Sequence, residues 1–137
     1  MSDPYIDNAL TTAYIAGGFD ATPTAYPNDG FDPGNLSDYN EIYLIPSQSE
    51  QASFGQGGLD KESGVFQITL NCKVGSLDGP ILARARAIKS YYQQNNILTY
   101  SSITVNIKTI TIGQGYKSDN WYKVPVSINY ESRLNRG

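Results

Sequence analysis

The stretch from Asp119 to Glu131 constrains the fold more than any other part of the chain, because apolar and polar residues alternate along most of it. The apolar positions are Tyr122, Val124, Val126, Ile128 and Tyr130, and the positions between them are Lys123, Pro125, Ser127 and Asn129. Successive side chains of a β-strand point to opposite faces, so the pattern predicts a long strand with one buried face. Proline cannot donate a ladder hydrogen bond, and we therefore expect Pro125 to face a sheet edge or a bulge.

Composition indicates a single domain, residues 1–137, with a generous share of loop. The chain has 137 residues, 39% hydrophobic content, 13 glycines and 7 prolines. That length is enough to bury one modest core. Eleven tyrosines are an excess. Tyrosine joins a large apolar area to a polar tip, so the surplus fits a surface buried on assembly or a tyrosine-lined carbohydrate site. Ordinary strand tyrosines explain it equally well.

The absence of histidine excludes several kinds of chemistry. Ser-His-Asp and Cys-His catalysis need a histidine, and the chain has none. The single cysteine, Cys72, cannot form an internal disulfide or a zinc site, and we expect it to be a buried small hydrophobe. We see no signal peptide and no stretch long enough to span a membrane, so we expect a soluble protein made in a reducing compartment.

Charge is divided unequally between the two halves of the chain. Residues 1–62 carry ten acidic groups and one lysine, whereas residues 63–137 carry three acidic and nine basic groups. Such a split can create an acidic and a basic surface that meet in a head-to-tail assembly. Alternatively, the two halves interleave in space and the charges only keep the protein hydrated.

Periodicity predicts two helices and four strands. Asp3-Pro4 opens a helix over residues 4–16, and Gly17-Gly18 ends it. The stripe Ile81, Ala85, Ile88 and Tyr92 predicts a second helix, ended by Asn95-Asn96. Strands are expected over residues 39–46, 65–74 and 102–112, before the last one. A phase shift in the third strand predicts a β-bulge near Lys108-Thr109.

Two segments lack periodicity. The first, from Gly17 to Asp38, reads as a long loop, and loops of that length are usually functional. The second, from Ser47 to Ser63, is polar and glycine-rich and reads as a mobile hairpin arm that is disordered in the free subunit.

These elements predict an α+β fold with a four-stranded, mostly antiparallel sheet and two helices packed on one face, in the order α-β-β-α-β-β. The second helix should bury its stripe against the strands 65–74 and 119–131. The residues expected opposite it are Phe66, Ile68, Leu70, Val126 and Ile128.

Three local patterns could carry chemistry, and each has a simpler explanation. The acidic residues between Asn28 and Glu41 could bind Ca²⁺, but their spacing fits no EF-hand loop and turn-forming pairs account for them. The segment from Phe54 to Lys61 lacks the Ser or Thr after lysine that a phosphate-binding loop requires. Basic residues on polar strand faces could contact nucleic acid without sequence specificity. We therefore expect no catalytic, cofactor or metal site.

Several short motifs, taken in order, resemble a known family over nearly the whole chain. They are a short N-terminal helix, Pro23–Asn28 leading to Phe31-Asp32-Pro33, a strand ending in Ile45-Pro46, a Phe66-Gln67-Ile68 strand, a helix with Ala83, Ala85, Ala87 and Ile88, and the strand Trp121–Ile128. In this order and spacing the chain resembles the lambda-type phage tail terminators, the minor tail protein U family. One departure is the sparse charge on the N-terminal helix.

The resemblance implies a structural virion protein and no enzyme. Six copies would form a ring on the last ring of the tail tube, end its polymerisation and offer a surface to the head-completion or connector protein, while phage DNA passes through without specific contacts. The virion tail is then its place, after assembly in the host cytoplasm, with no membrane partner. The alternatives are another phage neck or tail-completion protein, a glycan-binding module, and an enzyme built on the acidic loop.

Two sets of residues are the candidate sites under this interpretation. The expected interface residues are Tyr43, Ile45, Phe54, Asp60, Lys61, Glu62, Arg84 and Arg86. The expected residues facing DNA in the lumen are Lys73, Lys108 and Lys123.

Overall fold

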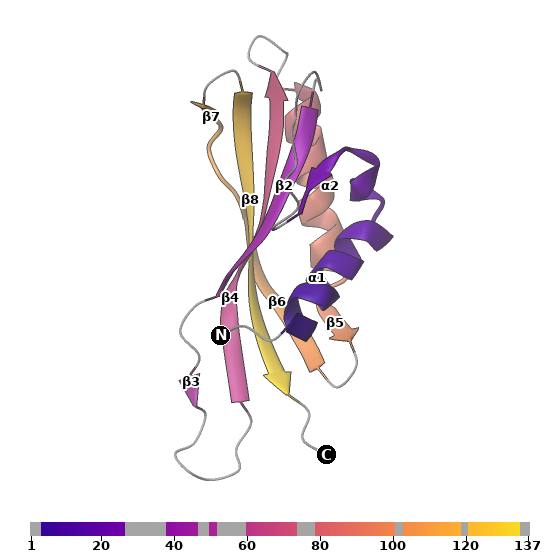
Figure 1. Cartoon of the computed structure of the whole chain (residues 1–137), viewed down its shortest axis with the longest axis vertical. Coiled ribbons are helices and arrows are strands. Elements are labelled where there is room, and N and C mark those ends of the chain that lie inside the picture. The colour runs from indigo at the N-terminus through magenta and orange to yellow at the C-terminus, as the bar shows by residue number, and fades with distance from the viewer. Residues whose placement is uncertain are drawn as a thin grey trace.

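The protein is a twisted sheet with two helices against one of its faces (Figure 1). The computed structural model describes residues 4–26, 38–46, 50–51, 60–73, 79–100, 103–118 and 121–134. The helical elements are α1 (Pro4–Ala16), η1 (Phe19–Ala21) and α2 (Gly79–Gln94). The strands are β1 (Thr24–Ala25), β2 (Asp38–Pro46), β3 (Glu50–Gln51), β4 (Asp60–Lys73), β5 (Ile97–Tyr100), β6 (Ile103–Ile112), β7 (Tyr116–Ser118) and β8 (Trp121–Leu134).

All eight of these strands belong to one sheet, in the order β1-β2-β4-β8-β6-β5. The short strands β3 and β7 pair with β4 and β8, respectively. The pairing of β1 with β2 is parallel, and the other pairs are antiparallel. The two longest strands, β4 and β8, are paired along 13 residues from Lys61 to Lys73, and this pair forms the centre of the sheet.

The predicted fold class is therefore wrong. The sheet is mixed and has eight described strands, whereas we expected four in a mostly antiparallel arrangement. The expected strands correspond to β2, β4, β6 and β8, and β4 begins earlier than predicted. The missed strands β1, β3, β5 and β7 have two to four residues each, which is too short to show the alternation on which a strand prediction depends.

The core lies between the helices and the sheet, and its prediction from the helical stripe is confirmed. Ile81, Ala85, Ile88 and Tyr92 of α2 are all buried. They belong to one cluster with Phe66, Ile68, Leu70, Val126 and Ile128 of the two central strands. Cys72 is also buried in this cluster, as expected. The alternation in β4 and β8 therefore does place one face of each strand in the core.

A buried polar network around Tyr14 holds α1 against the sheet. The Tyr14 hydroxyl lies 2.7 Å from Thr24 Oγ1, and Asn40 Nδ2 donates to it over 2.9 Å. These bonds join α1 to β1 and β2. In addition, the Tyr92 hydroxyl donates to the Leu10 carbonyl over 3.0 Å and joins the two helices. Burial raises the pKa of both tyrosines.

The bulge in β6 lies where it was expected. The register of β6 on β8 shifts between Ile107 and Thr109, so Lys108 is the extra residue. Pro125, in contrast, does not lie on an edge strand or at a bulge, because β8 is central. Its carbonyl accepts from Gly113 N at 2.7 Å, just beyond the end of β6. The missing N–H consequently points into the gap between β6 and β7, where the ladder is already interrupted.

Both segments predicted to lack structure contain regular elements. The loop from Gly17 to Asp38 includes η1 and β1, and residues 27–37 lie outside the described residues. Within the predicted arm, β3 pairs with Asp60 and Lys61, and β4 already includes the residues up to Ser63. Residues 47–49 and 52–59 lie outside the described part. Gly18 has φ of 80° and ends α1, as its position predicted.

Candidate functional site

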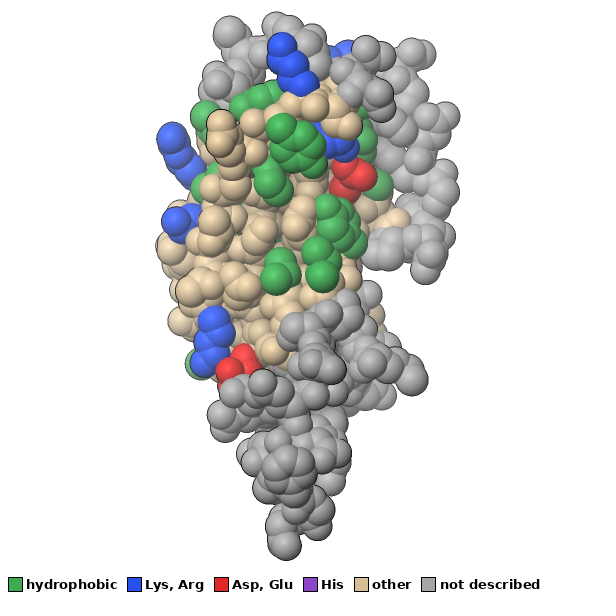
Figure 2. Space-filling view, turned by 90° about the vertical axis from the view of Figure 1, so that its left-hand side faces the viewer, with side chains coloured by type: hydrophobic (Ala, Val, Ile, Leu, Met, Phe, Trp, Pro, Cys, Tyr) green, Lys and Arg blue, Asp and Glu red, His purple; other side chains and the backbone are tan. Residues whose placement is uncertain are grey.

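The face of the sheet opposite the helices is a candidate functional surface. We call it the helix-free face and define it by the alternate strand residues whose side chains lie on the side of the sheet away from the helices. They are Tyr39, Glu41, Tyr43 and Ile45 of β2, Val65, Gln67, Thr69, Asn71 and Lys73 of β4, Thr109 and Thr111 of β6, and Trp121, Lys123, Pro125, Ser127 and Asn129 of β8. Figure 2 shows this face, on which charged side chains are few and apolar side chains form separate patches.

A charged cluster lies at the β2–β4–β8 junction, and its cation and carboxylate pair with each other. Lys123 Nζ lies 2.8 Å from Glu41 Oε1 and 5.9 Å from the centre of the Tyr39 ring. Asn71 is fully buried, and its Nδ2 donates to the same Glu41 oxygen over 3.2 Å. Burial acts to lower the pKa of Lys123, but the hydrogen bond and attraction to Glu41 outweigh it and raise the pKa. The pair therefore links β2 to β8 across β4.

The aromatic rings of this cluster pack against each other. Trp121 and Tyr39 meet edge to face with ring centres 4.7 Å apart. Tyr39 is buried and Trp121 is partly buried. A carbohydrate site needs an exposed ring face as a platform for the sugar, whereas these two rings cover each other. The arrangement favours a structural role for the pair.

The free end of β2 exposes two large apolar side chains. Tyr43 has 36% of its surface exposed and Ile45 has 46%. Gln67 Nε2 donates to the Tyr43 hydroxyl over 2.6 Å and to Thr69 Oγ1 over 3.1 Å. The Tyr43 ring is thus held in a fixed orientation on the surface, which lowers the entropy lost when a partner covers it.

The other predicted interface residues are in several environments. Arg84 of α2 is partly buried, and its Nη1 lies 2.9 Å from Asp38 Oδ2, so it links α2 to β2. Arg86 is exposed on the same helix. Asp60, Lys61 and Glu62 lie at the start of β4. The prediction for Phe54 falls outside the described residues.

Of the three lysines predicted to face DNA, Lys73 and Lys123 are diagonal neighbours on paired strands, and Lys108 lies apart from both. Lys73 is exposed at the end of β4, and Lys108 is exposed at the bulge of β6. Lys123 is instead paired with Glu41. Lys123 and Asn129, the β8 residue beside the bulge, are six positions apart, which is about 20 Å along a strand. Lys108 is therefore remote from the other two lysines, of which Lys123 is already paired with Glu41.

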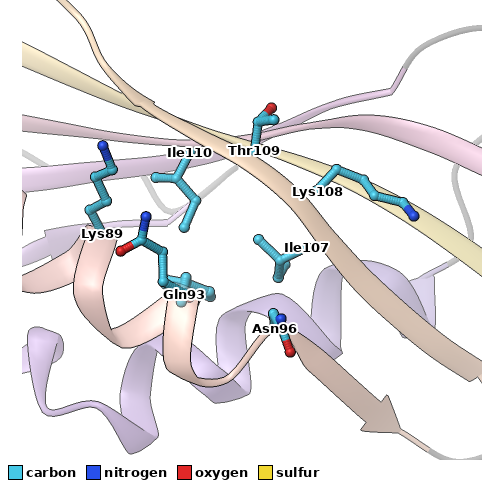
Figure 3. Close-up of a pocket in the computed structure, with 8 residues that line it drawn as sticks. Lys89, Gln93, Asn96, Ile107, Lys108, Thr109 and Ile110 are labelled. Carbon is cyan, nitrogen blue, oxygen red and sulfur yellow. The ribbon is translucent and has the colours of Figure 1, made fainter.

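A hollow of about 310 Å³ lies between α2 and the bulge of β6. Tyr92, Ile107 and Ile110 contribute apolar lining. Lys89, Gln93, Asn96, Lys108 and Thr109 supply the polar lining, and Figure 3 shows Lys108 extending away from the centre of the hollow. The Ile107 N–H donates to the Asn96 carbonyl over 2.7 Å, so one wall is held by the backbone.

The described residues give no support for metal binding or for a membrane span. Among them, no group of three or more His, Cys, Asp or Glu side chains could hold a metal ion. Two acidic residues of the segment between Asn28 and Glu41 are described, and they pair with cations: Asp38 with Arg84, and Glu41 with Lys123. Neither described α-helix is long and apolar enough to cross a membrane.

Comparison with known proteins identifies the family. A family model described as phage tail terminator protein matches residues 6–130. The chain belongs to the phage tail terminator family. The resemblance inferred from the short motifs is thereby confirmed, and the terminator is a structural component of a phage tail.

The terminator also resembles a solved structure. The two superpose with a TM-score of 0.79 over 100% of this chain and 99% of the other, with 21% sequence identity. At that identity the likeness shows a shared fold alone. No curated protein sequence matches the chain.

The structure adds contacts on the helix-free face that sequence reasoning missed. Gln67 fixes Tyr43, and Glu41 neutralises Lys123. Asn71, a polar residue of the helix-free face, is fully buried. The sequence offered one usable signal, because oppositely charged Glu41 and Lys123 each occupy a polar position of a predicted strand. Without the strand order, nothing placed those two strands on either side of β4.

Proposed function

We propose that six copies of this terminator form a ring that caps the tail tube. The ring ends polymerisation of the tube protein and presents a surface to the head-completion or connector protein. Phage DNA passes through its opening. Membership of the terminator family supports the tail location, and the geometry of β2 supports the assembly.

The observation that carries the assembly is the apolar free end of β2. Tyr43 and Ile45 are exposed beside a strand edge that no described strand covers. Exposed apolar edge strands promote association unless something covers them. In a ring-forming protein, the neighbouring subunit supplies the cover.

DNA contact in this proposal is weak and without sequence preference. Lys73 and Lys108 are exposed and can approach phosphates, whereas Lys123 is neutralised by Glu41. The rest of the helix-free face is largely uncharged (Figure 2). We expect any DNA binding by the purified protein to disappear at moderate salt, because few cations contribute to it.

The role is tested with a phage that lacks the gene. We expect tails of uncontrolled length that do not join heads, and added protein should restore joining. Tails of normal length that fail to join would instead indicate a neck or tail-completion protein. Normal length together with normal joining would contradict both roles.

Ring formation is tested separately by mass photometry over a range of concentrations. Ile45→Ser should weaken the ring and leave the subunit folded. The matched control is Ile15→Ser, because Ile15 is also 46% exposed but belongs to α1 and not to the exposed end of β2. If the two substitutions weaken the ring equally, β2 is not part of the interface.

A further inference from the structure

The described sheet has two edges that are only partly covered. On one side, β1 pairs only with Asn40 and Glu41, so the part of β2 from Ile42 to Pro46 has no described strand on its outer side. On the other side, β5 pairs only with residues 103–106 of β6. The part of β6 from Lys108 to Ile112 is therefore also uncovered by any described strand. The two free segments have the same length.

The strand directions suit a head-to-tail contact between these edges. From β2 through β4 and β8 to β6, every pairing is antiparallel, so β2 and β6 run in opposite directions. Copies related by rotation about a ring axis keep the same orientation along that axis. The β6 edge of one copy therefore meets the β2 edge of the next in an antiparallel sense, and the contact is heterologous, as a closed ring requires.

The backbone groups that point outward can be assigned on both edges. In an antiparallel ladder, alternate residues direct their N–H and C=O to opposite sides of the strand. Asn40 N donates outward to the Pro23 carbonyl, so the backbone N–H and C=O groups of Ile42 and Leu44 also point outward. On the other edge, Gly113 N donates inward to the Pro125 carbonyl of β8, so the backbone N–H and C=O groups of Ile110 and Ile112 point outward.

We infer that β6 of one subunit pairs with β2 of the next to form a continuous antiparallel sheet, with Ile42 opposite Ile112 and Leu44 opposite Ile110. This register uses both outward-pointing residues of each edge, and a shift by two residues would use only one pair. It ends where Pro46, which lacks an N–H, lies opposite Lys108 at the bulge.

Side chains agree with this register on both faces. Ile42, Leu44, Ile110 and Ile112 all lie on the helix-covered face, so their pairing extends the core from one subunit into the next. On the helix-free face, Tyr43 comes opposite Thr111 and Ile45 comes opposite Thr109. Aromatic and β-branched residues are favourable neighbours across strands. The exposed apolar pair of β2 is thereby covered.

Charge favours a second copy of this chain as the occupant of each edge. Residues 38–62, which include β2 and β3, hold five acidic groups and one lysine. Residues 79–112, which include α2 and β6, hold four basic groups and no acidic group. Asp38 and Glu41 are neutralised within the subunit. Lys89 and Lys108, which line the hollow beside the free edge of β6 (Figure 3), form no ion pair with any described residue.

This inference rests on the proposed ring, and cysteine cross-linking tests it separately. In the inferred register, Ile45 and Thr109 form a non-hydrogen-bonded pair, whose Cα atoms are about 4.5 Å apart in an antiparallel sheet. A disulfide fits that separation. Both side chains are exposed, and the native Cys72 is buried. The variant Ile45→Cys with Thr109→Cys should form a ladder of disulfide-linked species up to the covalent ring when oxidised in the assembled state.

The matched control is Ile45→Cys with Thr111→Cys, which moves one thiol two residues out of register. It should cross-link at least tenfold more slowly. Equal cross-linking would overturn the register, and a ring seen by mass photometry with no cross-link would overturn the edge pairing while leaving the proposed function intact. A cross-link to the tube protein instead would overturn the second copy as occupant. Loss of the ring itself, with normal tails in the gene deletion, would overturn the proposed function.

Discussion

The buried hydroxyl of Tyr14 offers a sharp test of how the N-terminal helix is held to the sheet. Tyr14 is fully buried, and its hydroxyl is the partner of Asn40 Nδ2 at 2.9 Å. The substitution Tyr14→Phe keeps the ring and removes only the oxygen. The carbonyl of Phe19 keeps a second donor, Thr22 N, and the hydroxyl of Thr24 still donates to the Thr22 carbonyl over 2.9 Å. The side-chain amide of Asn40, in contrast, loses its acceptor while 2% exposed.

The expected cost follows from that unsatisfied amide. A lost hydrogen bond costs about 1 kcal/mol, and a buried polar group left without a partner raises this to about 2–3 kcal/mol. For a chain of this length, each kcal/mol lowers Tm by about 3–5 °C, so we expect a decrease of roughly 6–15 °C. Thermal unfolding by circular dichroism and urea unfolding provide the two measurements.

A second substitution tests the reasoning and not only the magnitude. When both partners become apolar, the desolvation cost of the unpaired amide disappears. The double variant Tyr14→Phe with Asn40→Leu should therefore be more stable than Tyr14→Phe alone. The network does not hold α1 as described if Tyr14→Phe changes the free energy of unfolding by less than about 0.5 kcal/mol. The same conclusion follows if Asn40→Leu lowers the free energy of unfolding as much in the Tyr14→Phe variant as it does alone.

Three further predictions concern stability. Ile88→Ala should lower the free energy of unfolding by about 2–4 kcal/mol, because Ile88 is 1% exposed in the core. The control Ser90→Ala, on the exposed side of α2, should leave the free energy of unfolding almost unchanged. A change within error for Ile88→Ala would mean that α2 does not pack on the core. Lys123→Gln should lower the free energy of unfolding by about 1–2 kcal/mol, because it leaves the partly buried Glu41 without its cation. Adding Glu41→Gln should recover part of that loss. No recovery would mean that the two charges do not interact. The pKa values of Tyr14, Tyr92 and Lys123 are raised in the folded state. Their contribution to the stability of the fold is therefore complete below the ordinary tyrosine pKa of 10.0 and is lost as pH rises further. An unchanged Tm between pH 9 and 11.5 would contradict this prediction.

The predictions that succeeded depend on repeated patterns within single elements. Period-two alternation placed the long strands β4 and β8, and a helical stripe placed α2 and its buried residues. The phase shift around Lys108 located the bulge, because an extra residue exchanges the faces of all residues that follow. Each of these signals extends over several residues and needs no knowledge of neighbouring strands.

The predictions that failed required neighbours that lie far away in the sequence. The two residues of β1 are a strand only because β2 lies beside them, and nothing in Thr24-Ala25 alone shows this. Tyr14 was not recognised as a key residue, since its partners Thr24 and Asn40 come from two other elements. The pairing of Lys123 with Glu41, 82 positions away, was likewise not predicted.

By itself, the sequence determined the types of the long elements, the core face of each, and the family to which the protein belongs. These properties are recorded in residue order, as periodicity and as a succession of motifs. Only the tertiary structure decided the number and order of strands, the pairing of Glu41 with Lys123, and the two open edges that we propose join neighbouring subunits. Backbone hydrogen bonds of a sheet can form between almost any two strands, so the choice of partner depends on how all the elements pack together.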